Sequence, residues 1–471
     1  MRDSKLVQTL LQLDKAERNR FKKFLMSPFF NSDSNLIAIY EFIEGFLIKK
    51  PEELPDKKIL WGKLFKGIPY DDTRSRKYFS DILKLLTQFL SFDFYQNDPI
   101  TQDLFLLETI NNRKLTGLAN NSMKNARNHL AAKPLQNAQT FLQRYQLERN
   151  YYEVLNVEDN RKIRSNLDDI NANLDIFYFS EKLRIFCTAL ALQTVSAHSY
   201  AITYQEEILE IIEKKGFDTV PSVMVYAKLL HLFTHPSDED NYFSLRQSVS
   251  ENSLLFPKNE LTEIYSIIIN YATIQINTGN SKFSSDLFDF YKEVVSQNIL
   301  LEDQSFSPWH FRNIVVIGLR LREFTWIENF IKDYAPLLPE NQRENALTFN
   351  LAQLYFYQKK YDLVIKTLQS VEYDDYTYNL NSKNILICTY YDTGEIDALF
   401  FLLDSFRAFL NRNENIPEDR KNLYRNFISF TKKLAKLTPK DEKSKIKLTT
   451  ELQKTSNVAS KNWLLEKLAE L

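Results

Sequence analysis

Glycine is scarce in this sequence, with 8 among 471 residues, and proline is uncommon at 14. Nucleotide phosphate loops need closely spaced glycines, because the backbone must approach the phosphates without an intervening Cβ. No two glycines form a GxG or GxxxxGK pattern, which argues against Walker and Rossmann sites. Phenylalanine and tyrosine are plentiful instead, at 35 and 25 residues, so the composition favours long helices with large buried side chains over the tight turns of βαβ units.

Cysteine and long apolar runs are also lacking. The two cysteines, Cys187 and Cys388, lie far apart on apolar helical stripes and do not make a disulfide framework. We expect two buried structural thiols in a reducing compartment. No stretch reaches the ~18 consecutive apolar residues of a membrane-spanning helix, and the N-terminus has no signal-peptide pattern. The sequence therefore predicts a cytoplasmic protein that does not bind or cross a membrane.

Charge of one sign is not in excess, since the formal net charge is −1 and the pI about 6.6. No global field draws the chain toward nucleic acid. The last part of the sequence is locally basic, in the run KKLAKLTPKDEKSKIKLTTELQKT from 432 to 455. Such a run can contact phosphates, but the solvent-exposed face of terminal capping helices is the favoured interpretation.

Histidine is limited to five residues, and no catalytic or metal-binding pattern is complete. His231 and His235 lie one helical turn apart and could together ligate zinc. The zinc-protease pattern, however, requires Glu after the first His, where Leu232 stands here. Acidic pairs such as Asp71 and Asp72 suit helix capping or solvation. We expect a protein that is not an enzyme and that holds no cofactor and no metal.

The apolar residues recur with the spacing of helices almost everywhere, and strand-like alternation is nearly absent. The predicted fold class is all-α, with helices paired in antiparallel hairpins after residue 101. Boundaries are expected at Gly216, Pro221, Pro236, Pro257 and Pro308. We predict a helical N-terminal domain over 1–98, irregular helical hairpins over 99–305, repeats over 306–415 and capping helices over 416–471.

Local signals are clearest in the first of these domains. Asp14 and Glu17 have the spacing of a capping box, and Pro28 is expected to end the helix that follows them. Thr73 is the expected N-cap of a later helix. Phe29 and Phe30 are both predicted to pack between helices.

An internal repeat is evident between about 310 and 410. Trp326, Tyr361 and Ile396 are each 35 residues apart, which predicts three helix-turn-helix units in one register. The best unit has Leu351, Ala352, Tyr355, Tyr361 and Leu368. This unit resembles a tetratricopeptide repeat, whose period is 34 residues. The resemblance implies an α-solenoid of stacked helix pairs.

A solenoid of this kind implies a groove that binds a peptide or helix of another protein. By offset from the matched tyrosines, the lining would include Phe349, Gln353, Phe356 and Tyr357 in the best unit and Asn384, Cys388 and Tyr391 in the next. We therefore predict a non-catalytic interaction scaffold whose ligand is apolar or mixed, without the Lys and Asn clamp of chaperone-binding repeats. Placement of these aromatics in the core is the alternative.

The N-terminal region supports a second hypothesis. The stretch FKKFLMSPFFN is similar to the openings of uncharacterised bacterial helical proteins that carry such repeats, a similarity that implies no function. The order KKILWGKLF, turn, TRSRKYFSDILKLLTQFL resembles part of winged-helix regulators. That resemblance implies a DNA-associated regulator in which Arg74, Arg76, Lys77 and Lys84 contact DNA. Neither hypothesis predicts an oligomeric state.

Overall fold

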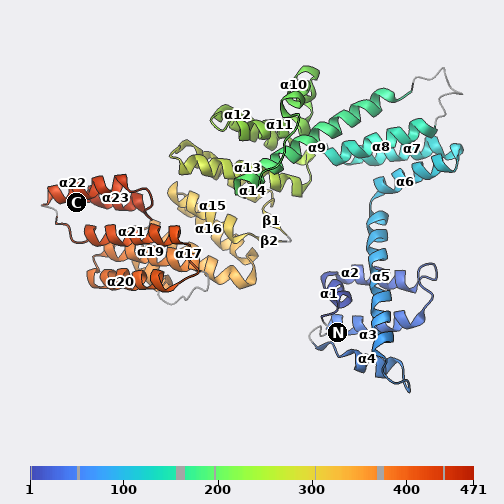
Figure 1. Cartoon of the computed structure of the whole chain (residues 1–471), viewed down its shortest axis with the longest axis horizontal. Helices are drawn as coiled ribbons and strands as arrows, with labels where there is room; N and C mark the ends of the chain where they lie inside the picture. Colours follow the sequence, from blue (N-terminus) through green and yellow to red (C-terminus); the bar gives the residue numbers. More distant parts are fainter. Residues whose placement is uncertain are drawn as a thin grey trace. The chain divides into compact units, whose positions relative to one another are not determined.

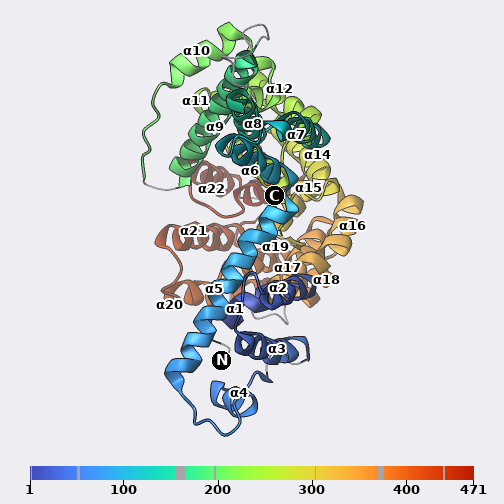
Figure 2. The same cartoon turned by 90° about the vertical axis from the view of Figure 1, so that its right-hand side faces the viewer.

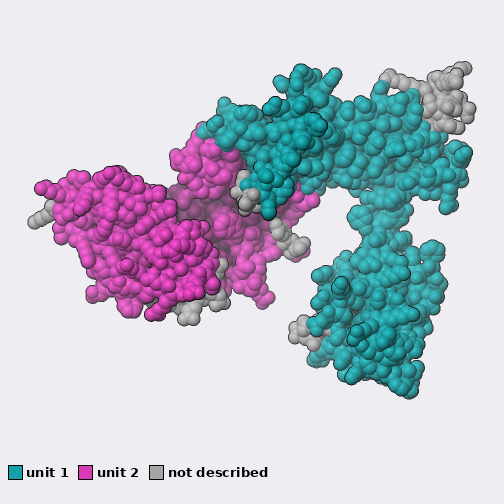
Figure 3. All heavy atoms as spheres, in the orientation of Figure 1, with its two compact units in different colours: residues 1–257 teal, residues 258–471 magenta. Residues whose placement is uncertain are grey.

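The computed structural model describes residues 1, 3–49, 53–154, 165–195, 198–302, 304–368, 376–438 and 441–471. These residues are mostly helical and contain almost no strand, so the predicted all-α class is confirmed. Their only strands are the two-residue β1 (Leu301–Glu302) and β2 (Ser305–Phe306), which pair antiparallel with Leu301 opposite Phe306. No helix in this described part is both long and apolar enough to span a bilayer. The chain divides into two compact units, residues 1–257 and 258–471 (Figure 3).

Twelve α-helices lie in the described residues of the first unit. They are α1 (Lys5–Gln12), α2 (Lys15–Met26), α3 (Ser34–Lys49), α4 (Lys57–Leu64), α5 (Asp72–Asn97), α6 (Pro99–Asn112), α7 (Ala119–Ala132), α8 (Ala138–Val154), α9 (Leu167–Val195), α10 (Gln205–Lys215), α11 (Pro221–Thr234) and α12 (Glu239–Asn252). Pro221 starts α11, and Gly216 ends α10 in the left-handed conformation that glycine adopts readily. The helix boundaries expected at these two residues are confirmed.

Helices α1, α2 and α3 pack against α5, whose first part forms a common core with them (Figures 1 and 2). The capping box is confirmed: Asp14 accepts a hydrogen bond from the backbone N–H of Glu17, and the Glu17 carboxylate accepts one from the backbone N–H of Asp14, both at 2.7 Å. Helix α2 ends at Met26, before Pro28, as expected. The core buries Trp61, whose indole N–H donates to the carbonyl of Ile68 at 3.1 Å.

Two local expectations are wrong. The N-cap of α5 is Asp71 and not Thr73, because the Asp71 carboxylate accepts the backbone N–H of Arg74 one turn further on. Phe30 does pack, stacked on Phe24 with ring centroids 3.9 Å apart. Phe29 does not, since 88% of its surface is exposed on the turn after α2.

The second unit holds eleven α-helices in its described residues. They are α13 (Lys258–Asn277), α14 (Lys282–Ser296), α15 (Pro308–Arg320), α16 (Phe324–Tyr334), α17 (Glu340–Tyr357), α18 (Tyr361–Leu368), α19 (Tyr376–Thr393), α20 (Ile396–Arg412), α21 (Glu418–Leu434), α22 (Glu442–Lys454) and α23 (Lys461–Glu470). Pro308 starts α15, as expected. Neighbours along the chain pack together, as α20 does with both α19 and α21 (Figures 1 and 2). In addition, α15 contacts α17, α17 contacts α19 and α21 contacts α23.

The turns inside three helix pairs have the same hydrogen-bonded geometry. Arg322, Lys359 and Gly394 each adopt a left-handed conformation, with φ of 61°, 58° and 74°. The next residue then donates its backbone N–H, at 2.9 Å, to the carbonyl five residues earlier, on Gly318, Tyr355 and Tyr390 respectively. This is the Schellman ending of a helix, which satisfies carbonyls left over in the last turn.

These turns correct the predicted 35-residue register. Lys359 and Gly394 are 35 residues apart, but Arg322 and Lys359 are 37 apart. Tyr361 and Ile396 are therefore the first residues of α18 and α20, whereas Trp326 is the third residue of α16. The structural equivalent of Tyr361 in the earlier pair is Phe324. Gly279, with φ of 102°, marks a fourth turn of this kind between α13 and α14, where Asn280 donates to the carbonyl of Gln275.

Candidate partner-binding site

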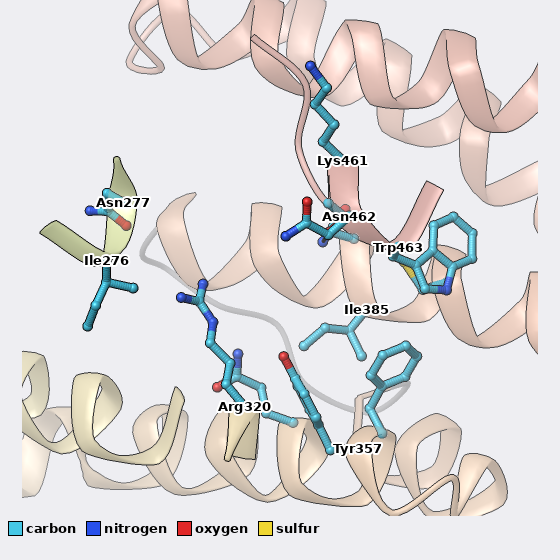
Figure 4. Close-up of a pocket in the computed structure, with 13 residues that line it drawn as sticks. Ile276, Asn277, Arg320, Tyr357, Ile385, Lys461, Asn462 and Trp463 are labelled. Carbon is cyan, nitrogen blue, oxygen red and sulfur yellow. Dashed lines mark hydrogen bonds between the residues drawn. The ribbon is translucent and has the colours of Figure 1, made fainter. Parts of the chain in front are cut away.

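The second unit contains a cavity of about 620 Å³, which we call the unit 2 cavity. Its floor comes from helices α13, α15, α17 and α19, and the start of α23 faces them (Figure 4). Its lining residues are Ile276, Asn277, Arg320, Gln353, Phe356, Tyr357, Asn384, Ile385, Cys388, Ser460, Lys461, Asn462 and Trp463. The lining thus combines aromatic rings, side-chain amides and two cations, without a carboxylate.

Three residues of this lining occupy equivalent places on their helices. Asn277, Arg320 and Tyr357 each stand two residues before the left-handed residue of the turn, which is Gly279, Arg322 and Lys359 respectively. Figure 4 shows Arg320 and Tyr357 extending into the cavity from the floor, while Asn462 enters it from the opposite side. The repeated turn geometry therefore accounts for three of the lining residues.

Four of the six predicted groove residues, together with Cys388, lie around this one cavity. Gln353, Phe356 and Tyr357 come from α17, and Asn384 comes from α19. The Phe356 ring is near both Tyr357 and Tyr361, with centroids 6.2 and 6.1 Å away. Cys388 is almost fully buried, and this burial raises the pKa of its thiol far above the usual range. Cys388 thus contributes apolar surface rather than a nucleophile.

The other two predicted residues do not line the cavity. Phe349 is completely buried, with the ring of Tyr378 5.5 Å away and the guanidinium of Arg312 5.8 Å from its centroid. Phe349 therefore lies in the core, which is the alternative placement given above for these aromatic residues. Tyr391 packs edge-on against Trp463, with centroids 5.3 Å apart and an interplanar angle of 83°. The chain's own helix α23 covers it.

Helix α23 is fixed to α19 by polar contacts as well as by this ring pair. The amide nitrogen of Asn384 donates to the Ser460 hydroxyl at 2.8 Å. The Lys467 ammonium lies 3.2 Å from Oδ1 of Asp392, and the Tyr361 hydroxyl donates to Oδ2 of the same carboxylate at 3.0 Å. Burial, assisted by the Asp392 charge, raises the pKa of Tyr361 to about 12. A carboxylate of α19 thus joins α18, α19 and α23.

Polar groups around the cavity differ in how well they are paired. Lys461 donates to the carbonyls of Gln453 and Thr455 at 3.0 and 2.8 Å, and Figure 4 shows its side chain pointing away from the cavity. Arg320 is exposed and points into it. Three buried atoms, Oε1 of Gln353, Oδ1 of Asn384 and the indole nitrogen of Trp463, have no hydrogen-bond partner among the described residues.

Comparisons of the chain with protein-family models, with curated proteins and with solved structures found no match.

Sequence reasoning missed Arg320, Asn277 and the residues from α23. The assumed 35-residue spacing aligned Arg320 with Tyr355, which is a packing position. The structural equivalent of Arg320 is instead Tyr357. The glycine in the sequence TGN at 278–280 was the available signal for Asn277, because a helix commonly ends in a left-handed glycine. No local signal shows that α23 returns to α19, since these helices are about 70 residues apart in the chain.

The four basic residues of the DNA hypothesis all lie on α5. Arg74 donates to the Tyr78 hydroxyl at 3.0 Å, and its guanidinium lies 5.9 Å from the Trp61 ring centroid. Arg76 pairs with Asp72 at 2.7 Å. Lys77 and Lys84 are exposed. Both arginines therefore have partners within the domain, although they are exposed like the two lysines. The domain has no β-strand in its described residues 3–49 and 53–98.

The histidine pair contacts an acidic residue of the neighbouring helix. His231 and His235 stack with centroids 4.3 Å apart, and Nε2 of His231 lies 2.9 Å from the Asp238 carboxylate. That hydrogen bond lowers the pKa of Asp238, which also caps α12 through the backbone N–H of Asn241. No cluster of three or more metal-ligating side chains occurs within the described ranges.

Proposed function

We propose that this protein is a non-catalytic interaction scaffold that binds a peptide or helical segment of another protein in the unit 2 cavity. One observation carries the proposal. Gln353, Phe356 and Tyr357 from one helix and Asn384 from the next converge on a single cavity, together with Arg320 from a third. Recognition of an amphipathic segment in a groove between helices is a recurrent binding mode.

The chemistry of the lining supports a segment of mixed character. Aromatic anchors such as Tyr357, which is 42% exposed, supply large contact area at little cost in conformational entropy. The amides of Gln353 and Asn384 offer oriented hydrogen bonds to a peptide backbone or a polar side chain. Arg320 adds a planar cation at one end of the lining, which suits an acidic residue in the bound segment.

We further propose that the second unit is a tetratricopeptide-like α-solenoid. In such an array the first helix of each pair contacts the first helix of the next, and those helices form the inner face. The contacts from α15 to α17 and from α17 to α19 follow this scheme. In the best unit, Ala352 is completely buried and Tyr361 starts the second helix, which agrees with the resemblance of that unit.

The experiment is affinity purification from cell extract with the full chain, comparing wild type with a Phe356→Ala/Tyr357→Ala double variant. Truncating both rings removes the aromatic part of the lining, so we expect recovery of bound partners to fall at least about tenfold. Phe401→Ala is the matched control, because Phe401 is 78% exposed on α20 and does not line the cavity. Equal partner recovery from both variants, with unchanged helical circular dichroism, would remove this assignment.

A further inference from the structure

Helix α23 has two features that disfavour it as an isolated helix. It is 10 residues long, shorter than the ~12–15 residues at which isolated helices become stable in water. Its N-cap, Ser460, has a left-handed backbone with φ of 48° and does not cap the helix with its side chain. A non-glycine residue in that conformation is strained. Helix α23 therefore depends on its contacts with the rest of the unit.

Residues on both sides of the cavity have buried polar atoms that are not paired. The buried indole nitrogen of Trp463 comes from α23, and the buried oxygens of Gln353 and Asn384 come from the floor. None of these three atoms has a hydrogen-bond partner within the described part of the chain. Buried polar groups without partners oppose association. A helix that supplied those partners would fit this surface better than α23 does.

Other contacts of α23 are specific and define a pattern. Trp463 packs on Tyr391 and on Phe427, with centroids 5.3 and 6.2 Å away. Leu464 and Leu468 are buried on one face of the helix, and Lys467 reaches the Asp392 carboxylate. The pattern is an aromatic residue followed directly by Leu, with Lys and Leu one turn later.

We propose that α23 covers part of the partner site, the surface around Tyr391 next to the unit 2 cavity, and is displaced from it by a helix of another protein that carries the same pattern. This inference rests on the proposed function and names its partner: an amphipathic helix with an aromatic-Leu-x-x-Lys-Leu face. Hydrogen-bond donors on that helix satisfy the oxygens of Gln353 and Asn384. Helix α23 competes with the partner helix for the same surface. The full chain therefore binds the partner more weakly than a chain whose α23 is undocked.

The test is the binding of a fluorescent peptide with the sequence of residues 456–471 to the full-length protein, measured by anisotropy. In the chain, a Trp463→Ala/Lys467→Ala variant weakens the docking of α23 while leaving the floor residues intact. We expect this variant to bind the peptide at least about tenfold more tightly than wild type does. Glu466→Gln, an exposed position of the same helix, is the matched control and should bind as wild type does.

Two further measurements keep the inference falsifiable. A peptide carrying Lys467→Glu should lose its affinity for the variant chain, because it would place a carboxylate against Asp392. Hydrogen exchange on wild type should show amides of 461–470 exchanging at least about tenfold faster than those of α21. Equal peptide binding by wild type and both variants would contradict the inference, and so would equally slow exchange of α23 and α21. Either result would show that α23 stays docked on the second unit. In that event, loss of partners from the Phe356/Tyr357 variant would still uphold the proposed function.

Discussion

Lys467 and Asp392 form a largely buried ion pair that connects the last helix of the sequence to α19. The ammonium lies 3.2 Å from Oδ1, and the two side chains are only 14% and 7% exposed. The second carboxylate oxygen accepts the Tyr361 hydroxyl, so the charge of Asp392 has partners on two sides. Although burial opposes the charged form of Lys467, its hydrogen bonds to Glu470 and Asp392 leave its pKa raised.

Removing the cation of this pair should destabilise the second unit. We expect Lys467→Met to lower the free energy of unfolding by up to about 3 kcal/mol, the cost of leaving the Asp392 charge buried without its cation. Release of α23 would expose Asp392 to water and make the loss smaller. Urea unfolding followed by circular dichroism measures this change. The double variant Lys467→Met/Asp392→Asn should recover most of the loss, since it removes both charges and keeps an acceptor for the Tyr361 hydroxyl. A loss equal to that of the single variant would show that the pair itself stabilises the fold.

Gly318 allows helices to approach closely. A Cβ at this position would meet Cε2 of Phe288 at 2.8 Å and would also overlap Ile327, and both of these residues are buried. We expect Gly318→Ala to lower the melting temperature and to cost about 1–3 kcal/mol. Gly62→Ala, in α4 with no atom within 4 Å of the added Cβ, should be neutral or stabilising by about 0.5–1 kcal/mol. Similar melting shifts for both variants would contradict this packing.

The left-handed turns predict opposite effects at equivalent positions. Lys359, with φ of 58°, should gain about 0.5–1 kcal/mol on replacement by glycine, which relieves the strain of its Cβ. Gly394→Ala, at φ of 74°, should lose about 1 kcal/mol for the same reason. Thermal unfolding of the two variants measures both signs. A loss at Lys359→Gly would indicate that its side chain contributes more than its backbone strain costs.

The two cysteines should be unreactive in the folded protein. Burial raises the pKa of Cys187 and Cys388, so that almost no thiolate forms near neutral pH. We expect negligible colour with Ellman's reagent under native conditions and reaction of both thiols once urea unfolds the chain. Fast native reaction of Cys388 would mean that the cavity floor opens frequently.

The DNA-associated hypothesis makes a separate prediction. A full-length protein of that kind should shift a DNA fragment in a gel at low salt and lose the shift as salt is raised. Arg74→Glu/Arg76→Glu should abolish the shift, whereas Lys214→Glu/Lys215→Glu, at exposed positions of α10, controls for net charge. Absence of any shift at low salt would remove the hypothesis, consistent with the partners that both arginines already have on α4 and α5.

The parts of the fold that local chemistry determines could be predicted from the sequence. Asp14 and Glu17 cap α2 because both groups lie within one turn of each other. The proline at the start of α15 and the all-α class follow from similarly local rules. Thr73 failed as a cap because Asp71, two residues earlier, competes for the same role with a carboxylate.

The candidate site was less predictable, for two physical reasons. The position of Arg320 depends on Arg322, a left-handed residue that is not glycine, so no glycine marks where the helix ends. The burial of Phe349 and the cover over Tyr391 depend on helices that are distant in the chain, which the spacing on α17 and α19 does not reveal. The sequence did predict four of the lining residues, because they lie on helix faces that packing within each pair leaves open. These residues are Gln353, Phe356, Tyr357 and Asn384.

The equivalence of Asn277, Arg320 and Tyr357 has an evolutionary consequence. An amide, a guanidinium and a phenol occupy the same place in three successive helix pairs, while the backbone turn that positions them is the same. Substitutions at these positions would change the chemistry of the cavity lining while leaving the backbone turn as it is. Under the proposed function, descendants of such a chain would acquire new specificities one position at a time on an inherited framework.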